Sequence, residues 1–421
     1  MKIGAGTVRF IASALPGFMT IQAHAQTLVP IPAPTDAALV FAGDQFRFWL
    51  ALQAVTLALP LLALLLVKRT SIDARLAAWS GRRWPLHCGL LGVLFVLLYL
   101  VVSMPLGFWQ SVRIRRLLDM AAPSFPDWGV ARIGDLLPWL LLAALASWLP
   151  LWIVRRNPRW GWLGAAGVLS CAALGYLLWS GTPSASLNER YQALSDPDWQ
   201  SRFATLERKA GVRDIPLFIE QTRAGQSCRM SNLAIGLGPT GAIVLKDHIF
   251  EAWTPEMVEA AYAHELKHVL LDNNWRAALL VVLLVVFGAA TVNVFAVRGV
   301  RILGNRLGLT AGEPAVCLLM LLGFHVYMLV AQPVFNTVGR RFEFEADRFS
   351  LELTHHNLAR AQIPSQPCAP LSLPEETRFR QLYINNHPDM ATRIRFASSY
   401  RPWETGEPLV YAKYMNSKGA Q

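Results

Sequence analysis

Two histidines and a glutamate are spaced for metal-dependent hydrolysis. Residues 263–268 read A-H-E-L-K-H and contain the pattern H-E-x-x-H. On a helix, residues four positions apart share a face, so His264 and His268 would point the same way and could bind one metal ion. Glu265 lies beside them, where a carboxylate can take a proton from a water on the metal. Two surface histidines that lie one turn apart by chance are the alternative.

The residues before the motif favour the helix that this chemistry requires. Thr254 is a good N-cap, Pro255 suits the first helical position, and Glu256 suits the positive end of the helix dipole. Neither a glycine nor a further proline follows before Leu271. Small residues such as Ala260 would let other groups approach closely. We therefore expect both histidines on one continuous helix.

The hydrophobic residues are concentrated in long segments. Of the 421 residues, 53% are hydrophobic and 16% are charged, and the mean hydropathy is +0.33. Apolar segments of about 20 residues can cross a bilayer as helices. The near absence of charge within the segments, and the Lys and Arg clusters at their ends, argue against buried helices of a large soluble protein. Six spans are predicted, at 48–67, 86–106, 136–154, 160–179, 277–297 and 315–331.

The N-terminus allows two interpretations. Lys2 and Arg9 precede an apolar run, and A-H-A at 23–25 resembles a signal-peptide cleavage site. Residues 1–26 are therefore either a signal peptide or a first transmembrane helix. Residues 27–46, which contain three prolines, are predicted to be a short linker.

A polar segment precedes the metal motif. Its pattern predicts, in chain order, an amphipathic helix, a strand and a hairpin of two strands, at 187–210, 215–219, 233–237 and 242–245. The predicted metal helix follows directly. After it, the chain crosses the membrane in the fifth span and returns in the sixth. A third metal ligand is therefore expected either in the C-terminal segment or within 181–260, on the same side as the motif.

The C-terminal segment offers that third ligand. Catalytic zinc usually takes three protein ligands and a water, so two histidines leave one place to fill. Glu343 lies on a helical pattern, and Asp347 is four residues further on, hence on the same face. Asp347 could accept a hydrogen bond from a ligand histidine and fix its tautomer. A solvated helix with Arg–Glu pairs is the alternative interpretation.

These motifs carry a family resemblance. H-E-x-x-H followed by R-x-F-E-F-x-A-D at 340–347 resembles the integral-membrane zinc metallopeptidases of peptidase family 48. That family is typified by the type I CAAX prenyl proteases, with the bacterial heat-shock membrane peptidases as shorter relatives. The strands within 229–247 and the H-P pair at His387 with Arg393 extend the match. Looser similarity in the membrane part lies at Pro105, Trp109, Ser124, Trp128 and Asp135, so the resemblance covers most of the chain from about residue 86 onward.

The resemblance implies the roles of the central residues. One zinc ion per chain would be held by His264, His268 and Glu343. Glu265 would act as the general base, and His387 would stabilise the scissile carbonyl. Taken alone, a histidine before a proline is more often a turn residue.

The resemblance also implies roles around the zinc ion. Asp347 and Arg340 would support the site, and Asn232 and Ala234 would hold an extended substrate by strand addition. The expected fold is mostly α: a multi-pass transmembrane helical bundle with a zincin-type (gluzincin) α+β peptidase domain.

The predicted domains and activity follow. An N-terminal multi-span membrane domain would cover 27–180, and the peptidase domain would cover 181–421 with two inserted transmembrane helices, 277–297 and 315–331. The expected activity is that of a membrane-embedded zinc metalloendopeptidase that cleaves membrane-associated proteins or peptides. A catalytically silent membrane receptor or chaperone on the same scaffold is the alternative.

The charge distribution bears on partners and location. The net charge is +11, but arginines such as Arg82 and Arg155 flank apolar segments, so we expect a lipid bilayer and not nucleic acid as the partner. Lys and Arg are more frequent on the side opposite the zinc motif. This distribution favours an active site on the extracytoplasmic side of a bacterial inner membrane. The resemblance favours the cytosolic side. Cys228 and Cys368 lie outside the spans and could pair if their side is oxidising.

Overall fold

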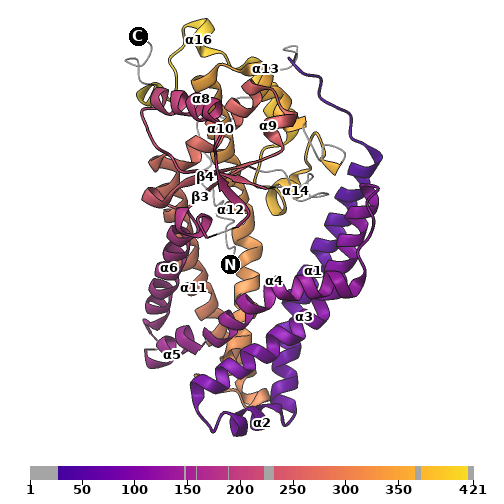
Figure 1. Cartoon of the computed structure of the whole chain (residues 1–421). Helices are drawn as coiled ribbons and strands as arrows, with labels where there is room; N and C mark the ends of the chain where they lie inside the picture. Colours follow the sequence, from indigo (N-terminus) through magenta and orange to yellow (C-terminus); the bar gives the residue numbers. More distant parts are fainter. Residues whose placement is uncertain are drawn as a thin grey trace, which may run out of the picture.

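Long helices make up the lower part of the molecule in Figure 1. The computed structural model describes residues 27–146, 148–157, 159–187, 189–221, 232–365 and 371–415. Within these residues, five helices are long and apolar enough to cross a membrane: α1 (Asp36–Arg69), α3 (Trp84–Leu117), α6 (Gly161–Trp179), α11 (Leu271–Leu307) and α12 (Val316–Thr354). Five of the six predicted spans fall within them.

The remaining predicted span, 136–154, falls on two helices. Residue 147, which separates the two in sequence, lies outside the described residues. The lower part therefore also contains three shorter helices: α2 (Ile72–Trp79), α4 (Phe125–Ala146) and α5 (Trp148–Arg156).

The first membrane helix begins earlier than the sequence suggested. The predicted linker 27–46 is wrong from Asp36 onward, because α1 starts there. Thr35 caps the helix, and its Oγ1 accepts a hydrogen bond from the Ala38 N–H at 3.1 Å. The predicted signal or anchor at 1–26 lies outside the described residues, as do Cys228 and Cys368.

A four-stranded sheet lies in the upper part. Its strand order is β1–β2–β4–β3, and β2 and β4 are parallel while each outer strand is antiparallel to its neighbour. The predicted hairpin is confirmed, with Leu233 opposite Val244 and a short turn, η1 (Gly238–Thr240), between its strands. The strands are β1 (Tyr191–Ala193), β2 (Leu217–Glu220), β3 (Leu233–Ile235) and β4 (Ala242–Lys246).

The helix predicted at 187–210 is wrong over its first half. Residues Tyr191–Ala193 form β1, and only Pro197–Lys209 form a helix, α8. Asp196 caps α8 by accepting hydrogen bonds from the next N–H groups. Pro197 at the first helical position disfavours helical backbone in the residue before it, so the helix cannot extend backwards.

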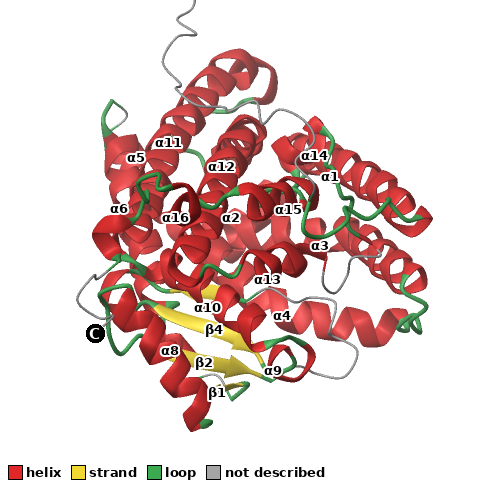
Figure 2. Ribbon diagram, turned by 90° about the horizontal axis from the view of Figure 1, so that it is seen from above, coloured by secondary structure: helices red, strands yellow, loops and turns green. Residues whose placement is uncertain are grey.

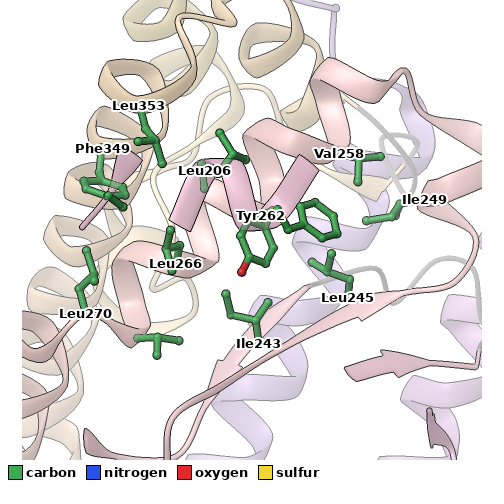
Figure 3. Packing of buried hydrophobic residues seen from close by; sticks show 14 of the residues in the cluster. Leu206, Ile243, Leu245, Ile249, Val258, Tyr262, Leu266, Leu270, Phe349 and Leu353 are labelled. Atoms are coloured by element: carbon green, nitrogen blue, oxygen red, sulfur yellow. The ribbon is translucent and has the colours of Figure 1, made fainter. Parts of the chain in front are cut away.

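The helix that carries the metal motif, α10 (Pro255–Val269), packs against the sheet beside β4, as Figures 2 and 3 show. Val258, Tyr262 and Leu266 lie on one face and pack with the buried side chains of Ile243 and Leu245. Burying a large apolar side chain is worth about 1.5–3 kcal/mol. This face therefore fixes the rotation of α10 about its axis.

Short helices connect these parts and surround the upper half of α12. Along the chain, α7 precedes the sheet, α9 precedes α10, and the other short helices follow α12. The buried carboxylate of Glu352 holds the segment before η4, because it accepts hydrogen bonds from the N–H groups of Val410 and Tyr411 at 3.1 and 2.8 Å. The bounds are α7 (Thr182–Ala185), α9 (Ile249–Ala252), α13 (Asn357–Gln362), η2 (Ile363–Ser365), α14 (Arg378–Tyr383), α15 (Met390–Ser399), α16 (Pro402–Thr405) and η4 (Ala412–Tyr414).

Candidate metal centre

The predicted helix signals are present at the start of α10. Thr254 is the N-cap, and its Oγ1 accepts a hydrogen bond from the Met257 N–H at 3.4 Å. Pro255 occupies the first helical turn. The helix then continues without interruption through His264 and His268, so both imidazoles come from one rigid element.

The carboxylate of Glu343, on α12, meets the two imidazoles. Glu343 Oε2 lies 3.2 Å from His264 Nε2, and Glu343 Oε1 lies 3.5 Å from His268 Nε2. One ligand atom from each residue lies within 4.8 Å of the others. Two imidazole nitrogens and one carboxylate oxygen are a donor set of catalytic zinc. The three side chains therefore fit one zinc ion.

Burial sets the protonation states of the residues on α10. It lowers the pKa of His264, and it lowers the pKa of His268 to about 3, so both imidazoles are in the neutral form that binds metal. Burial raises the pKa of Glu265 to about 7, against the opposing effect of His264. Among the described residues, no hydrogen-bond or ion-pair partner engages the Glu265 carboxylate. It can therefore exchange a proton near neutral pH.

Asp347 lies behind the first histidine. Its Oδ1 is 2.8 Å from His264 Nδ1, and Arg393 donates to both of its oxygens at 2.7 and 2.8 Å. Arg360 also pairs with Asp347, and its Nη2 lies 3.1 Å from His264 Nδ1. Because a guanidinium cannot accept a hydrogen bond, the imidazole and both arginines direct their donors at one carboxylate. This arrangement places the hydrogen of His264 on Nδ1 and leaves Nε2 for a metal.

The loop between α14 and α15 brings His387 to the same carboxylate. His387 Nε2 lies 3.2 Å from Glu343 Oε2, and half of the side chain, 50%, remains exposed. The loop approaches α12 at a glycine: a Cβ on Gly339 would lie 3.1 Å from the Cβ of Asn386. Gly339 therefore permits the close approach that positions His387.

Arg340 contacts this loop. Its guanidinium donates to the main-chain oxygens of Gln381 and Asn385, the latter at 2.8 Å. Asn336, on the same helix, donates to the Leu382 oxygen at 2.9 Å. Arg340 therefore contacts the segment that leads to His387, and among the described residues its hydrogen-bond partners do not include a proposed metal ligand.

Asn232 and Ala234 lie on the hairpin. Asn232 Oδ1 accepts a hydrogen bond from the Lys246 N–H at 3.2 Å, which ties the start of β3 to β4. Ala234 lies opposite Ile243 of β4. Within the described sheet, β3 is an edge strand, so its other edge has no strand partner. An edge strand can pair with an extended peptide.

Two residues at the site have no counterpart among the predicted ones. Arg360 is 96 positions from His264, and Asn336 is 46 positions from Leu382. Both are almost fully buried, with 3% and 2% of their surfaces exposed. No local spacing marks either residue, because each acts on a partner far along the chain.

Known proteins resemble this chain in sequence and in fold. Residues 200–401, which contain every proposed zinc ligand, match Peptidase family M48. An uncharacterized metalloprotease from Bacillus subtilis (strain 168), YhfN, is 20% identical over 310 residues, which cover 73% of this chain and 72% of the relative. The crystal structure of S. mikatae Ste24p superposes with a TM-score of 0.56 at 17% identity and covers 75% of each chain.

Proposed function

Because the chain belongs to peptidase family M48, we propose that it is a membrane-embedded zinc endopeptidase in which His264, His268 and Glu343 hold the metal. The observation that carries this assignment is the approach of one carboxylate to two imidazoles, at 3.2 and 3.5 Å. When bound, zinc would polarise a carbonyl oxygen and lower the pKa of water toward ~7.

Glu265 is the proposed general base. Its carboxylate is buried next to His264, has a pKa raised to about 7, and follows directly on a ligand in sequence. A base of this pKa can take a proton from the attacking water and return it to the leaving amine.

His387 is the proposed stabiliser of the oxygen on the scissile carbonyl. Its Nε2 lies 3.2 Å from Glu343 Oε2 and its Nδ1 lies 2.8 Å from Asn386 Oδ1, so each ring nitrogen faces an acceptor oxygen. The proposed role requires a hydrogen on Nε2. Because half of the side chain is exposed, this N–H can also be donated to a substrate oxygen as negative charge develops. Asn232 and Ala234 would hold the peptide main chain along the edge of β3.

Membrane-associated proteins or peptides are the proposed substrates. The predicted span within α12 ends at Ala331, and a helix rises about 18 Å over the 12 residues from there to Glu343. On the other side, α11 begins at Leu271, directly after α10. The proposed zinc site therefore lies close to the boundary of the apolar helices.

The proposed location of the site is the extracytoplasmic side of a bacterial inner membrane. Support comes from the excess of Lys and Arg at the opposite ends of the apolar helices. Trp79 ends α2, which lies at the bottom of Figure 1, and its surface is 76% exposed. Leu187 is 72% exposed and follows α7, which is tied to the turn of the hairpin by a hydrogen bond from Thr182 Oγ1 to the Thr240 oxygen. A membrane-impermeant thiol reagent added to intact cells should label Leu187→Cys and spare Trp79→Cys. Labelling of Trp79→Cys alone would show the opposite orientation, with the site on the cytoplasmic side.

The decisive test of the activity is Glu265→Gln. We expect this variant to retain zinc and to lose peptide hydrolysis by about 10³-fold, because the base is removed and the ligands remain. Metal analysis and a peptide-cleavage assay measure the two effects. Glu256→Gln, an exposed residue at the start of the same helix, is the matched control and should behave as wild type. Wild-type hydrolysis by Glu265→Gln would refute the assignment, and a purified wild-type protein without zinc would favour the receptor or chaperone.

A further inference from the structure

A cavity of about 310 Å³ adjoins the candidate metal centre on the side of α14 and α15. Its wall includes His387 and Arg393. These residues contact the carboxylates of Glu343 and Asp347, respectively. Another part of the wall comes from the first turns of α1, including Gln45. The cavity therefore extends from the metal centre to the end of a membrane helix.

The walls of this cavity are held together by ring contacts. The rings of Phe46 and Trp49, on α1, each lie 5.0 Å from the ring of Phe379 on α14, both edge to face. Trp49 also lies 5.1 Å from the ring of Tyr383. Such aromatic pairs contribute about 0.5–1.5 kcal/mol each beyond their buried area. The position of α1 relative to α14 is therefore fixed, and with it the shape of the cavity.

The charged groups in the wall already have partners. Arg380 pairs with Glu376 on its own helix, Arg393 is engaged by Asp347, and Asp389 accepts a hydrogen bond from the Thr392 N–H at the start of α15. Burying a charged substrate side chain here would leave that charge without compensation, which is costly. The cavity is therefore suited to an uncharged side chain.

Gln45 supplies a free hydrogen-bond donor. Its Oε1 accepts a hydrogen bond from Arg380. Its side-chain NH₂ group has no hydrogen-bond partner among the described residues. Phe41, Leu371 and Leu373 make other parts of the wall apolar. Ser372, Asn385 and Asn386 add further uncharged polar groups to the wall. An entering side chain thus meets apolar surface beside uncharged polar groups, a combination that suits a neutral polar side chain.

We propose that this cavity is a specificity subsite that takes an Asn, Gln, Ser or Thr side chain of the substrate, with Gln45 as the residue that recognises it. The proposal rests on the endopeptidase function proposed above. Figure 1 shows the sheet and α14 on different sides of α12, which carries Glu343. A peptide paired with β3 would cross the metal centre, and one side chain near the cleaved bond would then enter the cavity.

A second cavity provides an internal control. It has the same volume, about 310 Å³, and is lined by residues of β1 and α8, among them Gln192 and Trp199. None of the proposed zinc ligands lines it. Replacing Gln192 there should perturb a cavity of equal size and leave substrate recognition unchanged.

The test is a cleavage profile of the purified full-length protein in detergent. The probe is a peptide library from a digested bacterial proteome, and mass spectrometry identifies the cleaved bonds. We expect wild type to enrich Asn, Gln, Ser or Thr at one position within three residues of the bond. Gln45→Glu keeps the side-chain shape and the Arg380 contact but replaces the NH₂ donor with an oxygen. It should reduce that enrichment by about 5- to 30-fold, with zinc content and the other positions unchanged.

Two further variants complete the test. Gln45→Leu should reduce the same preference, and Gln192→Leu should leave the profile as in wild type. A wild-type profile for Gln45→Glu would overturn the subsite, and so would an equal loss of preference at every position. If wild type yields no cleavage that Glu265→Gln abolishes, the endopeptidase function itself fails, and the subsite fails with it.

Discussion

The two helices that meet at the candidate metal centre are positioned by different sets of contacts. The 15-residue α10 is buried over most of its length, and apolar packing of Val258, Tyr262 and Leu266 orients it. The 39-residue α12 begins in the apolar part of the molecule and ends in the polar part. Its upper half packs Phe349 and Leu353 into the same apolar cluster and is also held by polar contacts, such as the hydrogen bond from Ser350 Oγ to the Ala260 oxygen at 2.6 Å.

This difference explains which parts of the site are local. The side chains on α10 that face the metal centre follow from helical spacing and from the packed face opposite them. Glu343 and Asp347, on α12, take part in the site only through contacts with distant segments. Asp347, for example, pairs with Arg360 and Arg393. A site built from both helices should therefore respond differently to changes on each.

The largest effect should come from removing a proposed ligand on either helix. His268→Ala on α10 and Glu343→Gln on α12 should both lose zinc, and hydrolysis should fall to the background of a metal-free sample, because two protein ligands do not hold a catalytic zinc. Metal analysis after dialysis measures this. Glu345→Gln, two residues further along α12, is the control and should retain zinc. If Glu343→Gln retained zinc, α12 would have no part in the site.

A smaller effect should separate the contacts that support the proposed zinc ligands from the contacts that only stabilise the fold. Asp347→Asn should lower zinc affinity by about 10- to 100-fold, because the carboxylate that orients His264 is lost. Tyr262→Phe removes a buried hydrogen bond to Glu207, 2.5 Å long, on the packed face of α10. It should cost about 1–3 kcal/mol of stability and leave zinc affinity unchanged. Competition with a chelator and thermal unfolding measure the two quantities, and equal zinc affinity in both variants would contradict the distinction.

The pH dependence of hydrolysis tests the base on α10. The pKa of Glu265 is raised to about 7, so the residue is mainly protonated below that pH and mainly ionised above it. Since only the ionised form acts as a base, kcat/KM should rise about ten-fold between about pH 6 and pH 8. The rise should persist in His387→Gln, at a lower overall rate. A flat profile in that variant would show that His387, and not Glu265, is the group whose ionisation controls the rate.

The smallest effect should come from the contacts that hold the His387 loop on α12. Arg340→Ala should lower kcat about five-fold with zinc content unchanged, because hydrogen bonds that position the loop are lost. Arg341→Ala is the matched control, since Arg341 is 74% exposed and pairs only with acidic Glu345 among the described residues. Equal rates for the two variants would show that His387 needs no support from Arg340.

Much of the fold was predictable where a single physical signal dominates. Long apolar segments predicted most membrane helices, and the Thr254-Pro255 cap predicted the start of α10. The failures occurred where tertiary contacts compete with local pattern. Residues Tyr191–Ala193 follow a helical pattern but pair with β2, and α1 begins at Asp36, where Thr35 caps it, and packs Phe46 against Phe379 of α14.

The site shows the same division. Helical spacing alone places His264 and His268 on one face, and the topology of two returning spans directs the search for a third ligand to Glu343. Arg360 and Asn336 could not be found in this way, because a buried polar residue is recognisable only once its partner is known.

The sequence by itself determined the chemistry available to this protein: the metal motif, the membrane helices and the candidate third ligand are all encoded within short windows. Only the tertiary structure decided that Glu343 meets both imidazoles, that two arginines converge on Asp347, and that His387 reaches the same carboxylate. The physical reason is that spacing along one helix is set by backbone geometry, whereas distances between helices are set by the packing and hydrogen bonds of residues far apart in the chain.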